Sequence, residues 1–65
     1  MQTLKNKRSE RGLTLSELSR RSGVSVSAIR GIESGDNSPS LRTVEKLARG
    51  LSCPVSELIE TEVTV

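Results

Sequence analysis

The sequence of 65 residues contains no histidine, phenylalanine, tyrosine or tryptophan, and it has a single cysteine, Cys53. Without histidine and with one thiol, a zinc site of the ordinary ligand type is excluded. One cysteine cannot form a disulfide within the chain, which favours a reducing, cytoplasmic compartment. The lack of aromatic rings excludes the stacking platforms on which RNA-recognition sheets and single-strand binders hold bases.

Long apolar runs are missing as well. No stretch approaches about 20 consecutive apolar residues, so no membrane-spanning helix is expected, and no basic segment leads into an apolar one as in a secretory signal. Apolar residues make up 32% of the chain, and a single domain of this size buries only about 60% of its unfolded surface. So small a core cannot line a cavity. We therefore expect that the protein is not an enzyme and that it binds neither a cofactor nor a small-molecule ligand.

Charge is distributed unevenly along the chain. Residues 1–35 carry seven lysines and arginines against three glutamates, whereas residues 36–65 carry three against five acidic residues. The balance is therefore +4 in the first part and −2 in the second, in agreement with the net charge of +2. A basic half is typical of a face that binds a polyanion, and a solvated surface of mixed charge is the alternative.

Apolar residues recur at helical spacing between frequent turn residues, which predicts an all-α fold built from short helices. Thr14 and Glu17 form a capping box, and Ser25 and Ser40 are further N-cap residues. Glycines follow the first four helical segments, where helices commonly end. These glycines are Gly12, Gly23, Gly35 and Gly50. The expected helices are 4–11, 15–22, 26–34, 41–49 and a short fifth helix of residues 54–59.

The expected core consists of the apolar positions that share one face of these helices. They are Leu4, Leu13, Leu18, Val24, Ile29, Ile32, Leu41, Val44, Leu47, Ala48, Leu51, Val55, Leu58 and Ile59. None of the helices is long enough to be stable alone, so packing of these residues must hold the helices together.

The last six residues alternate polar and apolar side chains, which is a strand pattern. Two interpretations are open: a frayed end of the chain, or a dimerisation strand that pairs with a second subunit through Val63 and Val65. The expected organisation is a domain of residues 1–59 followed by a tail of residues 60–65.

Two short helices joined by a tight glycine turn within the basic half describe a helix-turn-helix. Residues 17–35, ELSRRSGVSVSAIRGIESG, resemble the Cro and lambda-repressor-like (XRE-class) family of transcriptional regulators. The flanking segments RGLT at 11–14 and SPSL at 38–41 agree with this resemblance, which covers about residues 3 to 59. It implies a compact five-helix fold, a homodimer, and binding of double-stranded DNA with the third helix in the major groove.

The exposed side of the third helix is expected to read base edges, because an α-helix fits the major groove. The expected base contacts are Val26, Ser27, Arg30 and Gly31. Val26 offers an apolar contact to a thymine methyl group, and Arg30 a bidentate contact to guanine. Gly31 lets the backbone approach DNA closely or is simply a tolerated helix glycine. For Arg30 the alternative is an ion pair with Glu33 or Asp36.

Phosphate contacts are expected around the N-termini of the second and fourth helices, where free N–H groups meet anions. The expected residues are Thr14, Leu15, Ser16, Ser25, Asn37, Ser38, Ser40 and Arg42. Helix capping alone also explains Ser25 and Ser40, and solvation alone explains Arg42. Leu15 offers only its backbone N–H, at a position where relatives commonly carry glutamine.

The resemblance further implies an ion pair between Arg8 and Glu33 that links the first helix to the end of the third. We expect this pair to be partly buried and to have a structural role. Arginines late in the second helix, Arg20 and Arg21, are expected to be structural as well, because cations suit a helix C-terminus.

Four positions depart from the family pattern. Relatives commonly carry glutamine at the position of Leu15, long polar residues at those of Val26 and Gly31, and a basic residue at that of Asp36. Direct readout therefore depends on few side chains, and DNA shape contributes more. The leading hypothesis is a regulator, most simply a repressor, that binds a palindromic operator as a homodimer. The alternative is a protein-interaction module or antitoxin-like partner that keeps the fold without binding DNA.

Overall fold

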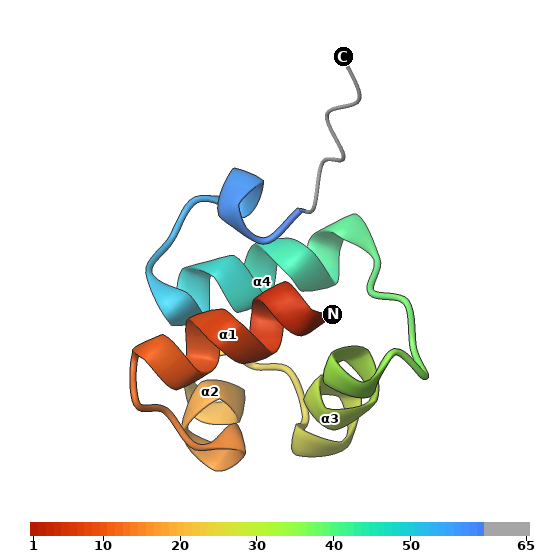
Figure 1. Cartoon of the computed structure of the whole chain (residues 1–65), viewed down its shortest axis with the longest axis horizontal. Helices are drawn as coiled ribbons and strands as arrows, with labels where there is room; N and C mark the ends of the chain where they lie inside the picture. The colour runs from red at the N-terminus through yellow and green to blue at the C-terminus, as the bar shows by residue number, and fades with distance from the viewer. Residues whose placement is uncertain (60–65) are drawn as a thin grey trace.

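The computed structural model describes residues 1–59, which form four α-helices and one turn of 3₁₀ helix. The elements are α1 (Gln2–Glu10), α2 (Leu15–Ser22), α3 (Val26–Ser34), α4 (Leu41–Leu51) and η1 (Val55–Glu57). No strand occurs in this range. α1 and α4 lie above α2 and α3 in the view of Figure 1, and α2 lies beneath the C-terminal part of α4. The prediction of an all-α fold is confirmed, but the expected fifth α-helix is a single 3₁₀ turn.

Local sequence signals set the start of three helices. The Thr14 Oγ1 accepts a hydrogen bond from the Glu17 N–H at 3.0 Å, and the Thr14 N–H donates to Glu17 Oε1 at 2.8 Å. Ser25 and Ser40 hydroxyl oxygens accept from the N–H groups three residues later, each at 3.2 Å. The predicted capping box and both predicted N-caps are therefore confirmed. Each satisfies a backbone donor that a helix N-terminus otherwise leaves without a partner.

The end of α4 differs from the prediction. The helix continues past Gly50 to Leu51 and ends at Ser52, a non-glycine residue with a left-handed φ of 56°. Gly50 is buried inside the helix, where an added Cβ would lie 2.9 Å from Ser22 Cβ and 3.2 Å from Leu18 Cδ1. The glycine thus allows α2 and α4 to approach closely. The prediction that Gly50 marks the end of the helix was therefore wrong.

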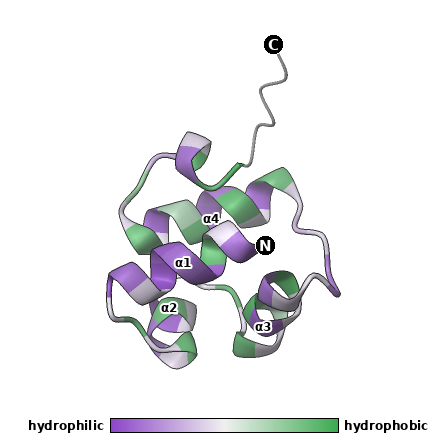
Figure 2. Ribbon diagram, viewed as in Figure 1, coloured by the Kyte–Doolittle hydropathy of each residue, from purple (hydrophilic) through white to green (hydrophobic). Residues whose placement is uncertain are grey.

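The core lies between the helices. Its buried residues are Leu4, Leu18, Val24, Ile29, Ile32, Val44, Leu47, Ala48, Leu51 and Leu58. Every one of them belongs to the predicted core. In Figure 2 each α-helix carries both hydrophobic and hydrophilic residues, as expected for helices that turn one face inward.

Two of the predicted core residues are exposed instead. Leu41 is 63% exposed and Ile59 is 40% exposed. Leu41 is the first residue of α4, directly after the Ser40 cap. Ile59 follows a 3₁₀ turn rather than lying within an α-helix, so α-helical periodicity does not carry it inward. Leu13 and Val55 are half-buried and pack against the core.

An ion pair ties η1 back to the helices. Lys7 Nζ in α1 lies 3.2 Å from Glu57 Oε1. Within residues 1–59 no helix is both long and apolar enough to cross a membrane. The predicted strand at Val63 and Val65 lies outside the described residues.

Candidate nucleic-acid interface

The turn between α2 and α3 consists of residues 23–25. Gly23 has a left-handed φ of 78°, and its N–H donates to the Ser19 carbonyl at 2.9 Å. The Ser22 hydroxyl donates to the Leu18 carbonyl at 2.7 Å and accepts from the Val24 N–H at 3.2 Å. The Val24 side chain is buried. Hydrogen bonds and burial together fix the angle at which α3 leaves α2.

α3 turns opposite sides to the core and to solvent. Ile29 and Ile32 are 0% and 3% exposed, whereas Ser27, Arg30 and Ser34 are exposed. The three exposed residues recur at spacings of three, four and seven, so they share one side of the helix. We call this side, with the half-buried Gly31 at its edge, the outer face of α3. Val26 is half-buried and lies beside this face rather than at its centre.

The Arg30 side chain makes neither an ion pair nor a hydrogen bond with the part of the chain that the structure describes. Of the two carboxylates considered as partners, Glu33 is paired with Arg8, and Asp36 is exposed. The Arg30 guanidinium therefore stands on the outer face with its donors open to an external acceptor.

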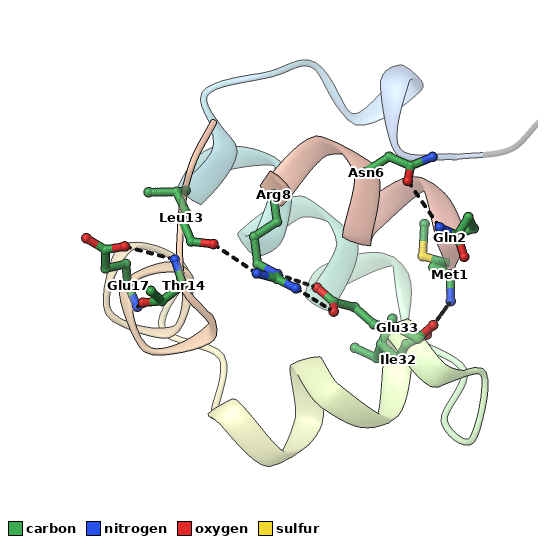
Figure 3. Close-up of polar contacts among 9 residues, drawn as sticks. All are labelled: Met1, Gln2, Asn6, Arg8, Leu13, Thr14, Glu17, Ile32 and Glu33. Carbon is green, nitrogen blue, oxygen red and sulfur yellow. Dashed lines mark hydrogen bonds and ion pairs between the residues drawn. The ribbon is translucent and has the colours of Figure 1, made fainter. Parts of the chain in front are cut away.

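The Arg8–Glu33 pair holds α1 to the end of α3 (Figure 3). Arg8 Nε and Nη2 donate to the two Glu33 carboxylate oxygens at 2.7 and 3.1 Å, and Nη1 donates to the Leu13 carbonyl at 2.9 Å. The side chains are 15% and 9% exposed. Hydrogen bonding to Glu33 raises the pKa of Arg8, against the opposing effect of burial. This bidentate geometry is the strongest form of such a pair.

A second link lies at the other end of α1. The Met1 nitrogen donates to the Ile32 carbonyl and, at 3.3 Å, to the Glu33 carbonyl (Figure 3). Both carbonyls belong to the last turn of α3, and that of Ile32 also accepts from the Gly35 N–H at 3.2 Å. Both ends of α1 therefore contact the last turn of α3, on the side away from the outer face.

The residues expected to contact phosphate lie mostly at the surface. Those that are exposed are Thr14, Ser16, Ser25, Asn37, Ser38, Ser40 and Arg42. Leu15 is half-buried and packs against the core, which leaves its backbone N–H as its contribution. The Ser40 hydroxyl is doubly engaged, since it also shares a hydrogen bond of 3.0 Å with Thr43 Oγ1. Arg42 has no ion-pair partner among residues 1–59.

One contact at the outer face was not expected from the sequence. The Asn37 N–H donates to the Gly31 carbonyl at 3.1 Å, and the Asn37 side chain lies against Gly31. A Cβ added at Gly31 would stand 2.1 Å from Asn37 Nδ2 and 2.9 Å from Cγ. The sequence carries no signal for this contact, because it depends on how the loop after α3 folds back on the helix.

Other kinds of site do not form in the described range. Residues 1–59 contain no group of three or more histidine, cysteine or carboxylate residues that could hold a metal, and no pocket. Cys53 is half-buried and forms no disulfide within the described range.

The sequence profile of the helix-turn-helix family matches residues 4–58, which includes all four α-helices but for the first residues of α1. The chain belongs to the helix-turn-helix family. The XRE-type resemblance predicted from residues 17–35 is thereby confirmed.

This helix-turn-helix domain is similar to the HTH-type transcriptional regulator SutR of Escherichia coli (strain K12), with 42% identity over 57 residues. The aligned region covers 88% of this chain and 32% of SutR, so the chain spans about a third of that relative's length. No solved structure matches the domain at a significant level.

Proposed function

We propose that this helix-turn-helix domain is a sequence-specific transcriptional regulator that binds double-stranded DNA with the outer face of α3. The observation that carries the proposal is a helix whose one side is locked to the core while Ser27, Arg30 and Ser34 stand exposed. The sequence relationship to a transcriptional regulator supports it. A basic balance of +4 in residues 1–35 supports attraction to a polyanion.

Base reading is assigned to a few side chains. Arg30 donates two hydrogen bonds to guanine O6 and N7, a contact that contributes about 1–3 kcal/mol of discrimination. The Ser27 hydroxyl reaches a neighbouring base edge, and Val26 meets a thymine methyl group. Gly31 is the fourth assigned position, and the Asn37 side chain lies against it.

Phosphate contacts fix the position of the domain on DNA without reading sequence. We assign them to the N-termini of α2 and α4, where backbone N–H groups and short hydroxyl side chains meet the phosphate backbone. The residues are Thr14, Leu15, Ser16, Ser25, Asn37, Ser38, Ser40 and Arg42. A serine hydroxyl that accepts the capping hydrogen bond still has its own hydrogen to donate, so capping and phosphate binding are compatible.

The proposed active form is a homodimer on a palindromic operator. Two copies would place their α3 helices in successive major grooves, about 34 Å apart. Val63 and Val65 are proposed to pair with the same segment of a second copy. Repression is the simplest outcome, because occupancy of an operator needs no further domain.

A salt series of duplex binding tests the proposal directly. Selection from a random duplex pool should return a preferred half-site, and its affinity should fall steeply with salt, since bound phosphates release counterions. Arg30→Ala should relax preference at one base position, whereas Arg42→Ala should weaken all sequences and lower the salt slope by about 1. Arg49→Ala, at an exposed arginine outside the assigned contacts, serves as the control. Absence of duplex binding at low salt would overturn the proposal.

A protein-interaction module is the second candidate. The exposed side chains of Leu41 and Ile59 favour it, because they present apolar surface on a domain of few apolar residues. Leu15 does not favour it, since its side chain packs against the core. If no duplex is bound, Leu41→Glu and Ile59→Glu should each weaken binding of a protein partner, because each places a charge on this exposed apolar surface.

A further inference from the structure

We propose that the Asn37 carboxamide is a base-reading group that takes the place of the side chain missing at Gly31. The inference rests on the proposed function and deepens it, because it replaces the phosphate contact assigned to Asn37 with a specificity-determining contact. Gly31 becomes a positioning residue, whose lack of a side chain lets Asn37 lie on the helix.

The chain turns back on α3 directly after the helix ends. Gly35 has a left-handed φ of 91°, and its N–H donates to the Ile32 carbonyl at 3.2 Å. Two residues later the Asn37 N–H donates to the Gly31 carbonyl at 3.1 Å. The loop backbone is therefore anchored to the second turn of the helix, and the Asn37 side chain starts from a fixed point.

The Asn37 side chain occupies the space that a residue 31 side chain would need. A Cβ at Gly31 would lie 2.1 Å from Asn37 Nδ2, 2.9 Å from Cγ and 3.5 Å from Cβ. Distances below 3.0 Å are not found between such atoms in folded proteins, so any larger residue at 31 has to displace the carboxamide. Asn37 and a side chain at position 31 are mutually exclusive in this conformation.

The position of Gly31 puts the carboxamide beside the proposed reading residues. Ser27 and Gly31 are four residues apart and share a side of α3, and Arg30 lies on the same outer face. Asn37 is exposed, and no hydrogen bond of its side chain is found within residues 1–59. The carboxamide thus adds a free donor and a free acceptor to the outer face.

The chemistry of the group favours a base over a phosphate. A carboxamide presents an N–H and a C=O side by side, which matches adenine N7 and the N6 amino group in the major groove. A phosphate can use only the N–H and would face the carbonyl oxygen with its own negative charge. The pairing with adenine satisfies both halves of the group.

Duplex selection with the full chain and five variants tests the inference. For Asn37→Ala we expect loss of adenine preference at one position, next to that read by Arg30, with a change in relative affinity of about 5- to 150-fold and an unchanged salt slope. Asn6→Ala, at an exposed asparagine of α1, is the matched control and should keep the wild-type preference. Asn37→Asp should reverse the preference towards cytosine, since a carboxylate accepts from its N4 amino group.

Gly31→Ala separates positioning from reading. Alone it should reduce the same adenine preference, because the methyl group displaces the carboxamide, and in the Asn37→Ala background it should add nothing. Thermal melting checks that each variant is folded. Additive effects of the two substitutions would overturn the role of Gly31. Uniform weakening of all sequences by Asn37→Ala, or no effect, would overturn the role of Asn37. Failure of the wild-type chain to bind any duplex would instead overturn the proposed function itself.

Discussion

The α2–α3 region and the region from α4 to Ile59 differ in the residues that start and end their helices. In the first, side-chain caps at Thr14 and Ser25 start the helices, and left-handed glycines at Gly23 and Gly35 end them. In the second, α4 ends at a left-handed serine, Ser52, and the next element is one 3₁₀ turn. Local signals therefore set both ends of α2 and α3, whereas in the second region such a signal, the Ser40 cap, sets only the start of α4.

The difference extends to the surfaces of the two regions. The outer face of α3 is polar and is supported from behind by the Arg8–Glu33 pair. The other region leaves apolar side chains exposed at Leu41 and Ile59. A rigid polar face suits recognition of a fixed ligand geometry. Variants of the ion pair, the packing glycine and the helix ends test how far the stability of each region depends on them.

Loss of Arg8 is expected to have the largest effect. Arg8→Ala leaves the Glu33 carboxylate, 9% exposed, without its partner, and breaking a buried pair in this way costs roughly 3–5 kcal/mol. We expect the lower end, about 3 kcal/mol, because Arg8 retains some contact with solvent. Urea unfolding measures the loss. Lys7→Ala is the control, since its partner Glu57 is 45% exposed, and it should lose less than about 1 kcal/mol. Equal losses would contradict the prediction.

Gly50→Ala should have the next largest effect, this time in the second region. The added methyl group would stand 2.9 Å from Ser22 Cβ and 3.1 Å from the Ser22 backbone nitrogen. Overpacking of this kind destabilises by about 1–3 kcal/mol, and we expect about 2 kcal/mol. Arg49→Ala, the exposed neighbour in α4, should change stability by less than about 0.5 kcal/mol. If Gly50→Ala stabilised the protein as an ordinary helix substitution does, α2 and α4 would not be in close contact.

Substitutions at two left-handed helix ends, Ser52→Gly and Gly23→Ala, should have a smaller effect on stability. Ser52 has a φ of 56°, a conformation that costs an L-residue about 1–2 kcal/mol, so Ser52→Gly should stabilise by about 0.5–1 kcal/mol after the entropy of glycine is subtracted. Gly23→Ala, at a φ of 78°, should destabilise by about 1 kcal/mol. Unfolding temperatures of the two variants should move in opposite directions, and movement in the same direction would refute the comparison.

Acidification should give the smallest effect, at the capping box. The hydrogen bond from the Thr14 backbone N–H, and then that with the Thr14 side chain, lower the pKa of Glu17 from its ordinary 4.5. A depressed carboxylate pKa means stability that is present above the unfolded-state pKa and is lost as pH falls through the folded-state pKa. The unfolding temperature should therefore drop less between about pH 6 and about pH 3 in Glu17→Gln than in the wild type. An equal drop would show that the cap does not depend on the charge.

The sequence predicted what depends on near neighbours along the chain. The caps at Thr14, Ser25 and Ser40 each involve a residue three positions away, so their chemistry is visible in the sequence. The bounds of α2 and α3 follow from such signals. The Arg8–Glu33 contact, across 25 residues, was expected only through resemblance to a family.

Features that depend on packing could not be predicted in this way. Leu41 has the spacing of a core residue but is exposed at the start of α4. Gly50 has the appearance of a helix end and serves an approach between two helices. At the interface, the contact of Asn37 with Gly31 depends on the path of a loop, for which no periodicity exists.

The third hydrogen bond of Arg8 has a consequence for the order in which the protein opens. The same guanidinium binds Glu33 and the Leu13 carbonyl, just before the chain enters α2. α1 and α3 are thereby joined into one cooperative unit, because neither helix can detach from the other without breaking a charged hydrogen bond. Amide hydrogen exchange in α1 and α3 should share a common opening free energy, while residues 53–59 should exchange through smaller, local fluctuations.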